Sequence, residues 1–424
     1  MIVMGGIVGS GIFRNPSVVA HQVHTPFLIL GVWVLGGALA MSGAFIWAEL
    51  ATRLPGAGGQ YAYLRDAYHP VVAFVYGWVL LLVTQTGGMA AVAVTFAGYF
   101  REISGVSWND SSIAAVALLA LTAINCMGAR AGSNVQSALM LLKTGAIAAM
   151  VVVGLALGGG TIHPRPLLDR PASFGLLGAI GAAMIPVGFA YGGWQTSTFV
   201  AAEMRDPRRD LSRGLVMGIS GVVLLYLSVN VVCLKVLGPA GLDHTATPAS
   251  DVMRRAMGDR GALWIAVGIA ISTLGFLSQG MLTAPRVYNA MARDGLFFHS
   301  VGWLSPRTGA PVVAILLQGV AATAIARSGK YEQILNYEVS VDFIAFALAA
   351  SSLFLFRRKD RGAREGAIYR SPGHPYTTAL FVLACVGIVV STVATYPANS
   401  GIAFLIMLAG VPVYLYWSRS QRNS

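Results

Sequence analysis

The sequence predicts an all-α membrane protein of about twelve transmembrane helices in a 5+5 inverted repeat, with discontinuous helices 1 and 6. Three observations lead to this prediction. First, 56% of the 424 residues are hydrophobic and 11% are charged, whereas soluble proteins average about 25% charged residues. Second, twelve stretches approach the roughly 20 apolar residues that a bilayer span needs. Third, glycines interrupt the first and the sixth of these stretches.

The span count gives the order of the elements. The predicted spans are 1–24 (broken), 26–52, 70–100, 111–129, 133–158, 174–203 (broken), 211–237, 262–292, 309–327, 331–356, 376–396 and 400–418. Five spans in each repeat invert the second repeat relative to the first. We therefore expect one polytopic membrane domain over residues 1–424, with repeats at 1–158 and 174–356 and two extra spans at 376–418. The loop 238–261 is expected to form small surface helices.

Lysine and arginine are shared unequally among the predicted loops. With the N-terminus in the cytoplasm, the inside loops carry more than twice as many of these residues as the outside loops, as at Arg357-Arg358-Lys359. This bias predicts that both termini are cytoplasmic and that the protein spans the cell membrane several times. The net charge of +12 then belongs to short loops. Because no loop is long enough to form a basic face, we expect the lipid bilayer, and no nucleic acid, as a partner.

The first interruption lies at Val8–Phe13, where Gly9 and Gly11 stand two residues apart. Glycine costs about 1 kcal/mol relative to alanine inside a helix, so the pair indicates a break. Lipid cannot satisfy the freed backbone groups, so the break must line a cavity in the protein. Free N–H groups attract anions and free carbonyls attract cations. The pattern predicts a site for a small molecule that carries both charges, such as an amino acid.

Particular backbone groups are assigned to the two charges. The N–H groups of Ser10, Gly11 and Ile12 are expected to hold a carboxylate. The carbonyls of Ile7 and Val8, on the other side of Gly9, are expected to hold an ammonium.

The second interruption is predicted over Gly188–Trp194. It is expected to offer the carbonyls of Phe189, Ala190 and Gly192. One glycine pair would only permit close helix packing, but two pairs, each opening one repeat, favour a binding site. Phe189 and Trp194 flank this break and are candidate gates over a bound side chain. Packing in the core explains Trp194 equally well.

Charged residues inside the spans are the remaining candidates. Lys143 lies deep in the fifth span, where a charge costs about 3 kcal/mol unless it is partnered. It is expected to change its protonation state during transport or to replace a bound sodium ion. Asp342, in the tenth span, is expected to face the substrate or relay a proton, and Glu338 to reach the outer interface. Glu49 and Glu203 are expected to pair with loop arginines.

No catalytic constellation is visible in the sequence. Serine, histidine and cysteine do not group at the spacing of a nucleophilic site, and no phosphate-binding loop occurs. Cys126, Cys233 and Cys385 lie in apolar spans without metal-ligand spacing. We therefore expect no enzyme, no cofactor and no metal. The cysteines are expected to pack, and none is positioned to bridge to an accessory subunit.

Several ordered motifs resemble the amino acid–polyamine–organocation superfamily, and specifically the bacterial relatives of the L-type amino acid transporters. The motifs are Ile7–Phe13, Ala48–Leu50 with Leu54-Pro55 and Gly58–Leu64, Phe189–Trp194 with Glu203-Met204 and Asp206–Arg208, and Thr283–Arg286 with Ala290–Gly295. The resemblance runs nearly from end to end. It implies the LeuT-like fold described above and sodium-independent amino acid transport by alternating access, as an exchanger or a proton-coupled symporter.

The resemblance also implies roles for individual residues. The substrate carboxylate would lie on Ser10 and Gly11, and the α-amino group on the carbonyls of Ile7, Phe189 and Gly192. Lys143 would occupy the place of a sodium site, and Asp342 would lie near the pocket.

Two departures from the family pattern stand out. Gln60 replaces the usual acid, which is expected to weaken a cytoplasmic contact. Only eight residues precede Gly9, which rise about 12 Å and make a short inner half-helix. Two alternatives to an amino acid transporter remain, namely a polyamine or organic cation carrier and an amino acid sensor that does not transport. A polyamine carrier is expected to have more acids at the pocket.

Overall fold

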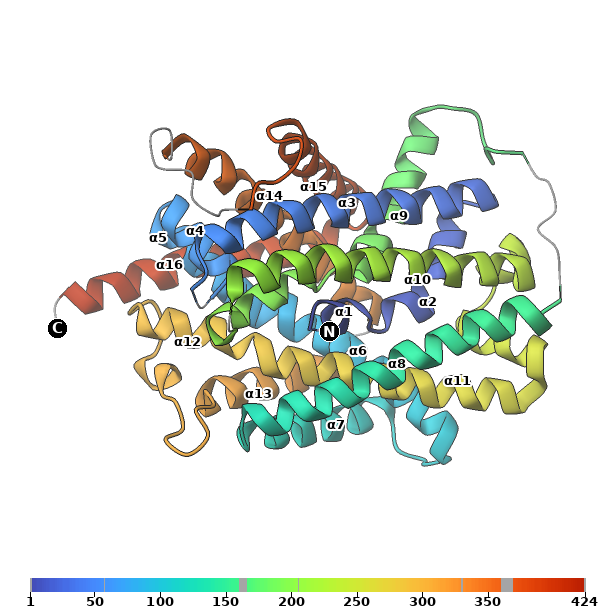
Figure 1. Ribbon diagram of the computed structural model, residues 1–424, viewed down its shortest axis with the longest axis horizontal. Helices are drawn as coiled ribbons and strands as arrows, with labels where there is room; N and C mark the ends of the chain where they lie inside the picture. Colours follow the sequence, from blue (N-terminus) through green and yellow to red (C-terminus); the bar gives the residue numbers. More distant parts are fainter. Residues whose placement is uncertain are drawn as a thin grey trace.

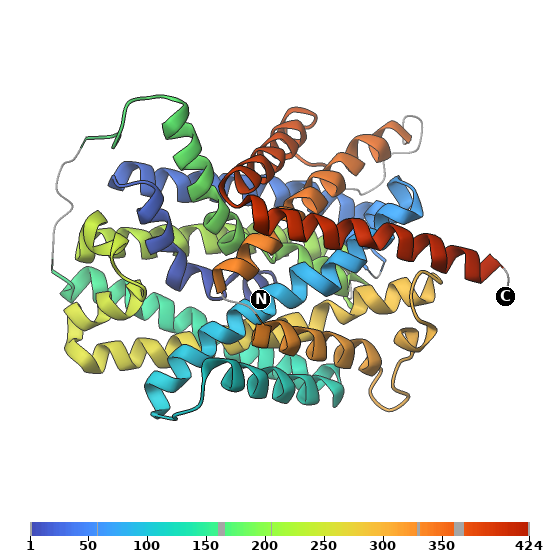
Figure 2. The same cartoon turned by 180° about the vertical axis from the view of Figure 1, so that it is seen from behind.

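The computed structural model describes residues 2–56, 58–159, 166–204, 206–328, 331–359 and 369–422, and within these ranges the side chains of 2, 129–136, 202–203, 207–208, 331–333, 335 and 419–422 lie outside the description. Every regular element in the described ranges is a helix. The long helices run side by side along the longest axis of the molecule (Figure 1). The N-terminus lies near the middle of the bundle, whereas the C-terminus lies at one end (Figure 2).

A helix covers each of the predicted ranges. In chain order, the elements are α1 (Ile2–Ile7), α2 (Gly11–Gln22), α3 (Pro26–Arg53), α4 (Gln60–Ala67), α5 (Pro70–Val79), η1 (Leu80–Thr84), α6 (Gln85–Ser104), α7 (Asp110–Cys126), α8 (Ala129–Leu157), α9 (Phe174–Tyr191), η2 (Trp194–Glu203), α10 (Pro207–Asp243), α11 (Pro248–Thr283), α12 (Pro285–Arg293), η3 (His299–Gly302), α13 (Val312–Ser328), α14 (Tyr331–Lys359), α15 (Tyr376–Thr395) and α16 (Pro397–Arg422).

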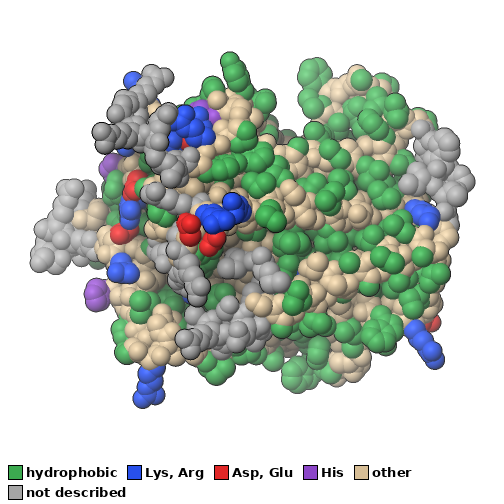
Figure 3. All heavy atoms as spheres, in the orientation of Figure 1, with side chains coloured by type: hydrophobic (Ala, Val, Ile, Leu, Met, Phe, Trp, Pro, Cys, Tyr) green, Lys and Arg blue, Asp and Glu red, His purple; other side chains and the backbone are tan. Residues whose placement is uncertain are grey.

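Length and hydropathy identify the helices that can cross a bilayer. Within the described residues, nine helical segments are long and apolar enough, and α7 and α13 are shorter apolar helices. Hydrophobic side chains are spread over the whole visible face, and charged side chains gather mainly toward the end that carries the C-terminus (Figure 3). This is the surface pattern of a multi-pass membrane protein.

Three long segments depart from a regular α-helix. The segment from Pro70 to Ser104 contains a π-helical turn, η1, between α5 and α6. Gly238 (φ 70°) kinks α10, and Gly258 (φ 71°) kinks α11. The helical residues after Gly238, up to Asp243, and those from Pro248 to the kink at Gly258 confirm the small helices predicted in 238–261.

Glu49 connects three segments by hydrogen bonds at the end of the bundle that carries the loop arginines. Its carboxylate is fully buried, and it accepts hydrogen bonds from Arg53 (Nη2, 2.7 Å), Arg357 (Nη2, 2.6 Å) and the backbone N–H of Ser371 (2.7 Å). These bonds join α3, α14 and the segment before α15. The prediction of a structural ion pair is confirmed for Glu49, whereas the Glu203 side chain lies outside the described residues.

The structure also shows where the three cysteines and Gln60 lie. Cys233 and Cys385 are buried in the hydrophobic core, as expected for packing residues, and Cys126 is half-buried. Gln60 begins α4 and is fully buried, and neither polar atom of its side chain has a hydrogen-bond partner among the described residues.

Candidate functional site

The first predicted break is present. Helix α1 ends at Ile7 and α2 begins at Gly11, so Val8, Gly9 and Ser10 are not helical. The N–H groups of Gly11 and Ile12 precede the first hydrogen bonds of a helix that begins there, whereas the Phe13 N–H bonds the Ser10 carbonyl at 3.2 Å. The Ser10 hydroxyl is fully buried and has no hydrogen-bond partner in the described part of the chain. A buried end with unpaired donors is where an anion binds favourably.

The second break is narrower than predicted. Helix α9 continues to Tyr191, and only Gly192 and Gly193 separate it from η2. Gly193 has φ 98°, a conformation that residues with a side chain rarely adopt. Phe189 and Ala190 therefore lie in the last turn of α9, where carbonyls lack helical partners. The Phe189 carbonyl accepts from the Gly192 N–H at 3.1 Å.

The segment after the second break is a ten-residue 3₁₀ helix, η2. Runs of this length are uncommon. Three consecutive hydroxyl side chains account for it, because each donates to a carbonyl three residues earlier: Thr196 to Gly193 (2.7 Å), Ser197 to Trp194 (2.9 Å) and Thr198 to Gln195 (2.7 Å). Such local bonds compete with α-helical bonding.

The two breaks are in contact. A Cβ atom placed on Gly6, at the end of α1, would lie 2.5 Å from the carbonyl oxygen of Gly193. A Cβ atom on Gly11 would lie 2.8 Å from the Cα atom of Ala190. The amide of Asn15 also donates to the Pro186 carbonyl at 2.7 Å. Glycine at positions 6 and 11 therefore lets the two interrupted helices meet backbone to backbone.

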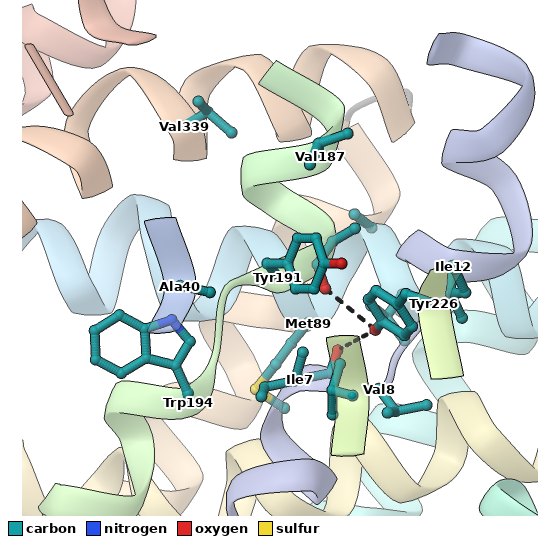
Figure 4. Close-up of a cluster of buried hydrophobic side chains, with 14 of the residues drawn as sticks. Ile7, Val8, Ile12, Ala40, Met89, Val187, Tyr191, Trp194, Tyr226 and Val339 are labelled. Atoms are coloured by element: carbon teal, nitrogen blue, oxygen red, sulfur yellow. Dashed lines mark hydrogen bonds between the residues drawn. The ribbon is translucent and has the colours of Figure 1, made fainter. Parts of the chain in front are cut away.

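Tyr226, on α10, joins both breaks. Its hydroxyl lies 3.2 Å from the carbonyl oxygen of Ile7 and 3.2 Å from that of Ala190, and Figure 4 draws both hydrogen bonds as dashed lines. Tyr226 is fully buried. Sequence reasoning did not find it. The available signal was a tyrosine inside an apolar span, since a buried hydroxyl needs a partner.

Lys143, on α8, lies beneath the first break and is fully buried. Its ammonium donates to the carbonyls of Gly5 (2.9 Å) and Val8 (2.6 Å). These two carbonyls belong to the end of α1 and to the break itself. Lys143 thus donates hydrogen bonds to backbone oxygens that lose their helical partners at the interruption.

A cavity of about 40 Å³ lies where the breaks meet, enough room for a few water molecules. Most of the predicted site residues line it: Ile7, Gly9, Ser10, Gly11, Phe189, Ala190, Gly192 and Asp342. Three do not. Val8 bonds Lys143, and Ile12 is buried in the hydrophobic core. Trp194 is packed against Trp47 (ring centroids 5.0 Å apart) and Phe346 (5.6 Å).

Several cavity residues were missed or assigned elsewhere. Glu338 was expected at the outer interface, but it lines the cavity beside Asp342. The expectation was wrong because Glu338 is one helical turn from Asp342 on α14, so the two side chains share a face. Polar residues from η1, α6, η2 and α11 complete the lining: Thr84, Gln85, Gln195, Thr196 and Gln279. Of these, Thr84 lies in the π turn, and Gln195 and Thr196 lie in the 3₁₀ helix.

These features define a multi-pass membrane protein with a polar cavity between two interrupted helices. The chain belongs to the amino acid permease family, whose model matches residues 1–417. Members of this family are transporters, not enzymes.

Three relatives illustrate the similarity. The chain is 29% identical over 422 residues to the serine/threonine exchanger SteT of Bacillus subtilis, covering 97% of this chain and 94% of the relative. It is 26% identical to the human large neutral amino acids transporter small subunit 2, over 99% of this chain and 80% of that protein. It is 30% identical to the human b(0,+)-type amino acid transporter 1, over 84% and 74% of the two chains.

Removing the Tyr226 hydroxyl tests the bridge between the breaks. We expect Tyr226→Phe to lower the free energy of unfolding by about 1 kcal/mol or more, because two buried carbonyls lose a donor. Thermal melting of the purified protein in detergent measures this. Tyr191→Phe is the matched control, since the Tyr191 hydroxyl is buried without a partner among the described residues. Equal losses in both variants would contradict the bridge.

Adding a side chain at Gly11 tests the close approach. We expect Gly11→Val to reduce uptake to less than about a tenth of the wild-type rate while the protein still inserts in the membrane, because the new atoms meet the backbone of Ala190. Gly31→Val, on α3, is the control, since no atom lies within 4 Å of a Cβ there. The amount of protein is measured in membrane fractions, and the transport rate is measured as the uptake of a labelled amino acid. Normal uptake by Gly11→Val would refute the site.

Proposed function

We propose that this protein carries amino acids across the cell membrane by alternating access, independently of sodium. The observation that carries the proposal is the opposite polarity of the two sides of one cavity. On one side are the first N–H groups of α2 and the unpaired Ser10 hydroxyl. Ile7, Ala190 and Gly192 also line the cavity, and the carbonyls of Ile7 and Ala190, which bond Tyr226, each keep a second lone pair. The α-carboxylate and the α-amino group of an amino acid match these two sides.

We further propose that the chain makes twelve spans in two inverted repeats, α1–α8 and α9–α14, with α15 and α16 outside the repeat. An interrupted helix opens each half, which is the arrangement of inverted-repeat transporters. The cavity has room for only a few water molecules, so we propose that it widens when an amino acid binds. Substrate binding therefore requires the half-helices around the breaks to shift, and the short non-helical segments are natural hinges.

The orientation follows from charge. We assign the end that contains Arg53, Arg357 and Glu49 to the cytoplasm, because the loops at that end carry the excess of lysine and arginine. The C-terminus, which lies at that end of the bundle (Figure 2), is then cytoplasmic in the proposed topology.

Sodium independence is supported by Lys143. Its ammonium bonds two carbonyls of the first interrupted span, and carbonyls at such a break are the groups that would otherwise coordinate a sodium ion. A permanent or reversible cation at this position supplies the charge without a bound metal. Exchange of substrates and symport with protons are both compatible with this arrangement. One relative is named an exchanger, which favours exchange.

Transport by the purified chain tests the proposal. The protein is reconstituted alone into liposomes loaded with unlabelled amino acids, and the entry of each labelled amino acid is measured in sodium and in choline buffer. We expect saturable uptake at equal rates in both buffers and without an accessory subunit. Binding of label without accumulation would indicate a sensor instead. Uptake that requires sodium would overturn the proposed coupling.

Replacing Lys143 tests its role in the cycle. We expect Lys143→Ala to lower uptake by about tenfold or more and to change its pH dependence, because the carbonyls of Gly5 and Val8 lose their cation. Lys235→Ala is the control, since Lys235 also donates to a carbonyl, that of Leu155, but at an exposed site. An unchanged pH profile at equal expression would exclude a protonation role for Lys143.

A further inference from the structure

The cavity has an acidic wall that the binding of a simple zwitterion does not use. Glu338 and Asp342 lie one turn apart on α14, and both line the cavity. Helix α14 is packed against α6 and η1, so this wall is built from different elements than the two breaks. Carboxylates at membrane depth are costly, and they usually mark a path or site for a cation.

One carboxylate oxygen of the acidic wall has no hydrogen-bond partner among the described residues and has space beside it. One oxygen of Glu338, Oε2, is buried and has no hydrogen-bond partner in the described part of the chain. A Cβ atom on Gly88 of α6 would lie 3.0 Å from this oxygen. A side chain at position 88 would therefore crowd the carboxylate, and glycine leaves room for it and for a ligand group beside it.

Two neutral side chains show independently that the cavity is a ligand site. The hydroxyls of Ser10 (0% exposed) and Thr84 (5% exposed) are buried without partners among the described residues, and both residues line the cavity. Thr84 ends the π-helical turn η1, and such turns occur mostly at functional sites. Buried polar groups without partners in the protein are expected to be satisfied by a ligand or by water.

The two carboxyl groups of the cavity need a cation or a proton to balance their charge. Among the described residues, the lining contains two acidic side chains and no lysine, arginine or histidine. The nearest buried cation identified at the breaks, Lys143, bonds the carbonyls of Gly5 and Val8. The carboxylate and ammonium of a neutral amino acid neutralise each other. Any negative charge on Glu338 and Asp342 would then remain uncompensated in a buried site unless a proton is bound, whereas a substrate with a cationic side chain compensates it directly.

We propose that Glu338 and Asp342 select amino acids whose side chain carries a positive charge. This inference rests on the proposed function, since the two breaks hold the α-carboxylate and the α-amino group. The guanidinium or ammonium of the substrate then lies against the acidic wall. A diamine or other polyamine would match the wall but would leave the Ser10 hydroxyl and the N–H groups of α2 without an anion.

Three related compounds separate these readings in the reconstituted protein. Arginine and citrulline have nearly the same shape, but only arginine has a charged side chain. Agmatine keeps the guanidinium and lacks the carboxylate. Each competes against one labelled amino acid that the wild-type protein transports. We expect arginine to compete about tenfold or more better than citrulline and than agmatine.

The variants assign the preference to the acidic wall. We expect Glu338→Gln and Asp342→Asn each to reduce the ratio of arginine to citrulline competition by about tenfold, because the buried charge partner is lost. Glu102→Gln, an exposed position on the same helix as Gly88, should leave the ratio unchanged. Thermal stabilisation of each purified variant by ligand shows whether it is folded and whether it still binds.

The contrary outcomes are distinct. Transport of neutral amino acids with equal competition by arginine and citrulline would overturn this inference and leave the proposed function intact. The same holds for a wild-type preference that survives in both acid variants. Competition by agmatine as strong as by arginine would favour a polyamine carrier. Absence of transport of every amino acid would overturn the proposed function and this inference with it.

Discussion

Backbone polar groups inside a membrane need partners, and the architecture around this cavity follows from that requirement. The break between α1 and α2 frees carbonyls and N–H groups at a depth where lipid offers no hydrogen bonds. Two side chains of the protein donate hydrogen bonds to the carbonyls, namely the ammonium of Lys143 and the hydroxyl of Tyr226. The Ser10 hydroxyl remains without a partner among the described residues, and the N–H groups that begin α2 precede the regular hydrogen bonds of the helix. The unequal treatment of donors and acceptors gives the cavity its polarity.

The close approach of the two breaks depends on glycine. Gly6, Gly11 and Gly193 lie where a Cβ atom would meet backbone atoms of the other interrupted helix. Tyr226 then bonds a carbonyl from each break. A movement of one half-helix therefore changes the hydrogen bonds and contacts at the other break. This link can couple substrate binding to a change of access. The Glu49 network ties α3 to α14 at one end of the bundle and is a further contact that such a movement would strain.

The sequence was sufficient to predict the helices and the first break, because apolar length and paired glycines are local properties. The second break was predicted too wide, since the helical bonds that carry α9 to Tyr191 depend on the packing of α2 against it. Trp194 was ambiguous because the rings of Trp47 and Phe346 that enclose it come from distant spans. Tyr226 was missed for the same reason, as the depth and rotation of a helix are set by its neighbours. Glu338 was misplaced although its spacing of one turn from Asp342 is visible in the sequence. The π turn that brings Thr84 to the cavity has no clear signal in the sequence.

The central claim is that the two breaks hold the two charged groups of one amino acid. The most direct test is a high-resolution structure of the protein with a transported amino acid bound. The account predicts the substrate carboxylate within hydrogen-bonding distance of the Gly11 N–H and the Ser10 hydroxyl, and the α-amino group against carbonyls of Ile7 and Gly192. A substrate bound away from both breaks, or bound with its carboxylate on the carbonyl side, would contradict it.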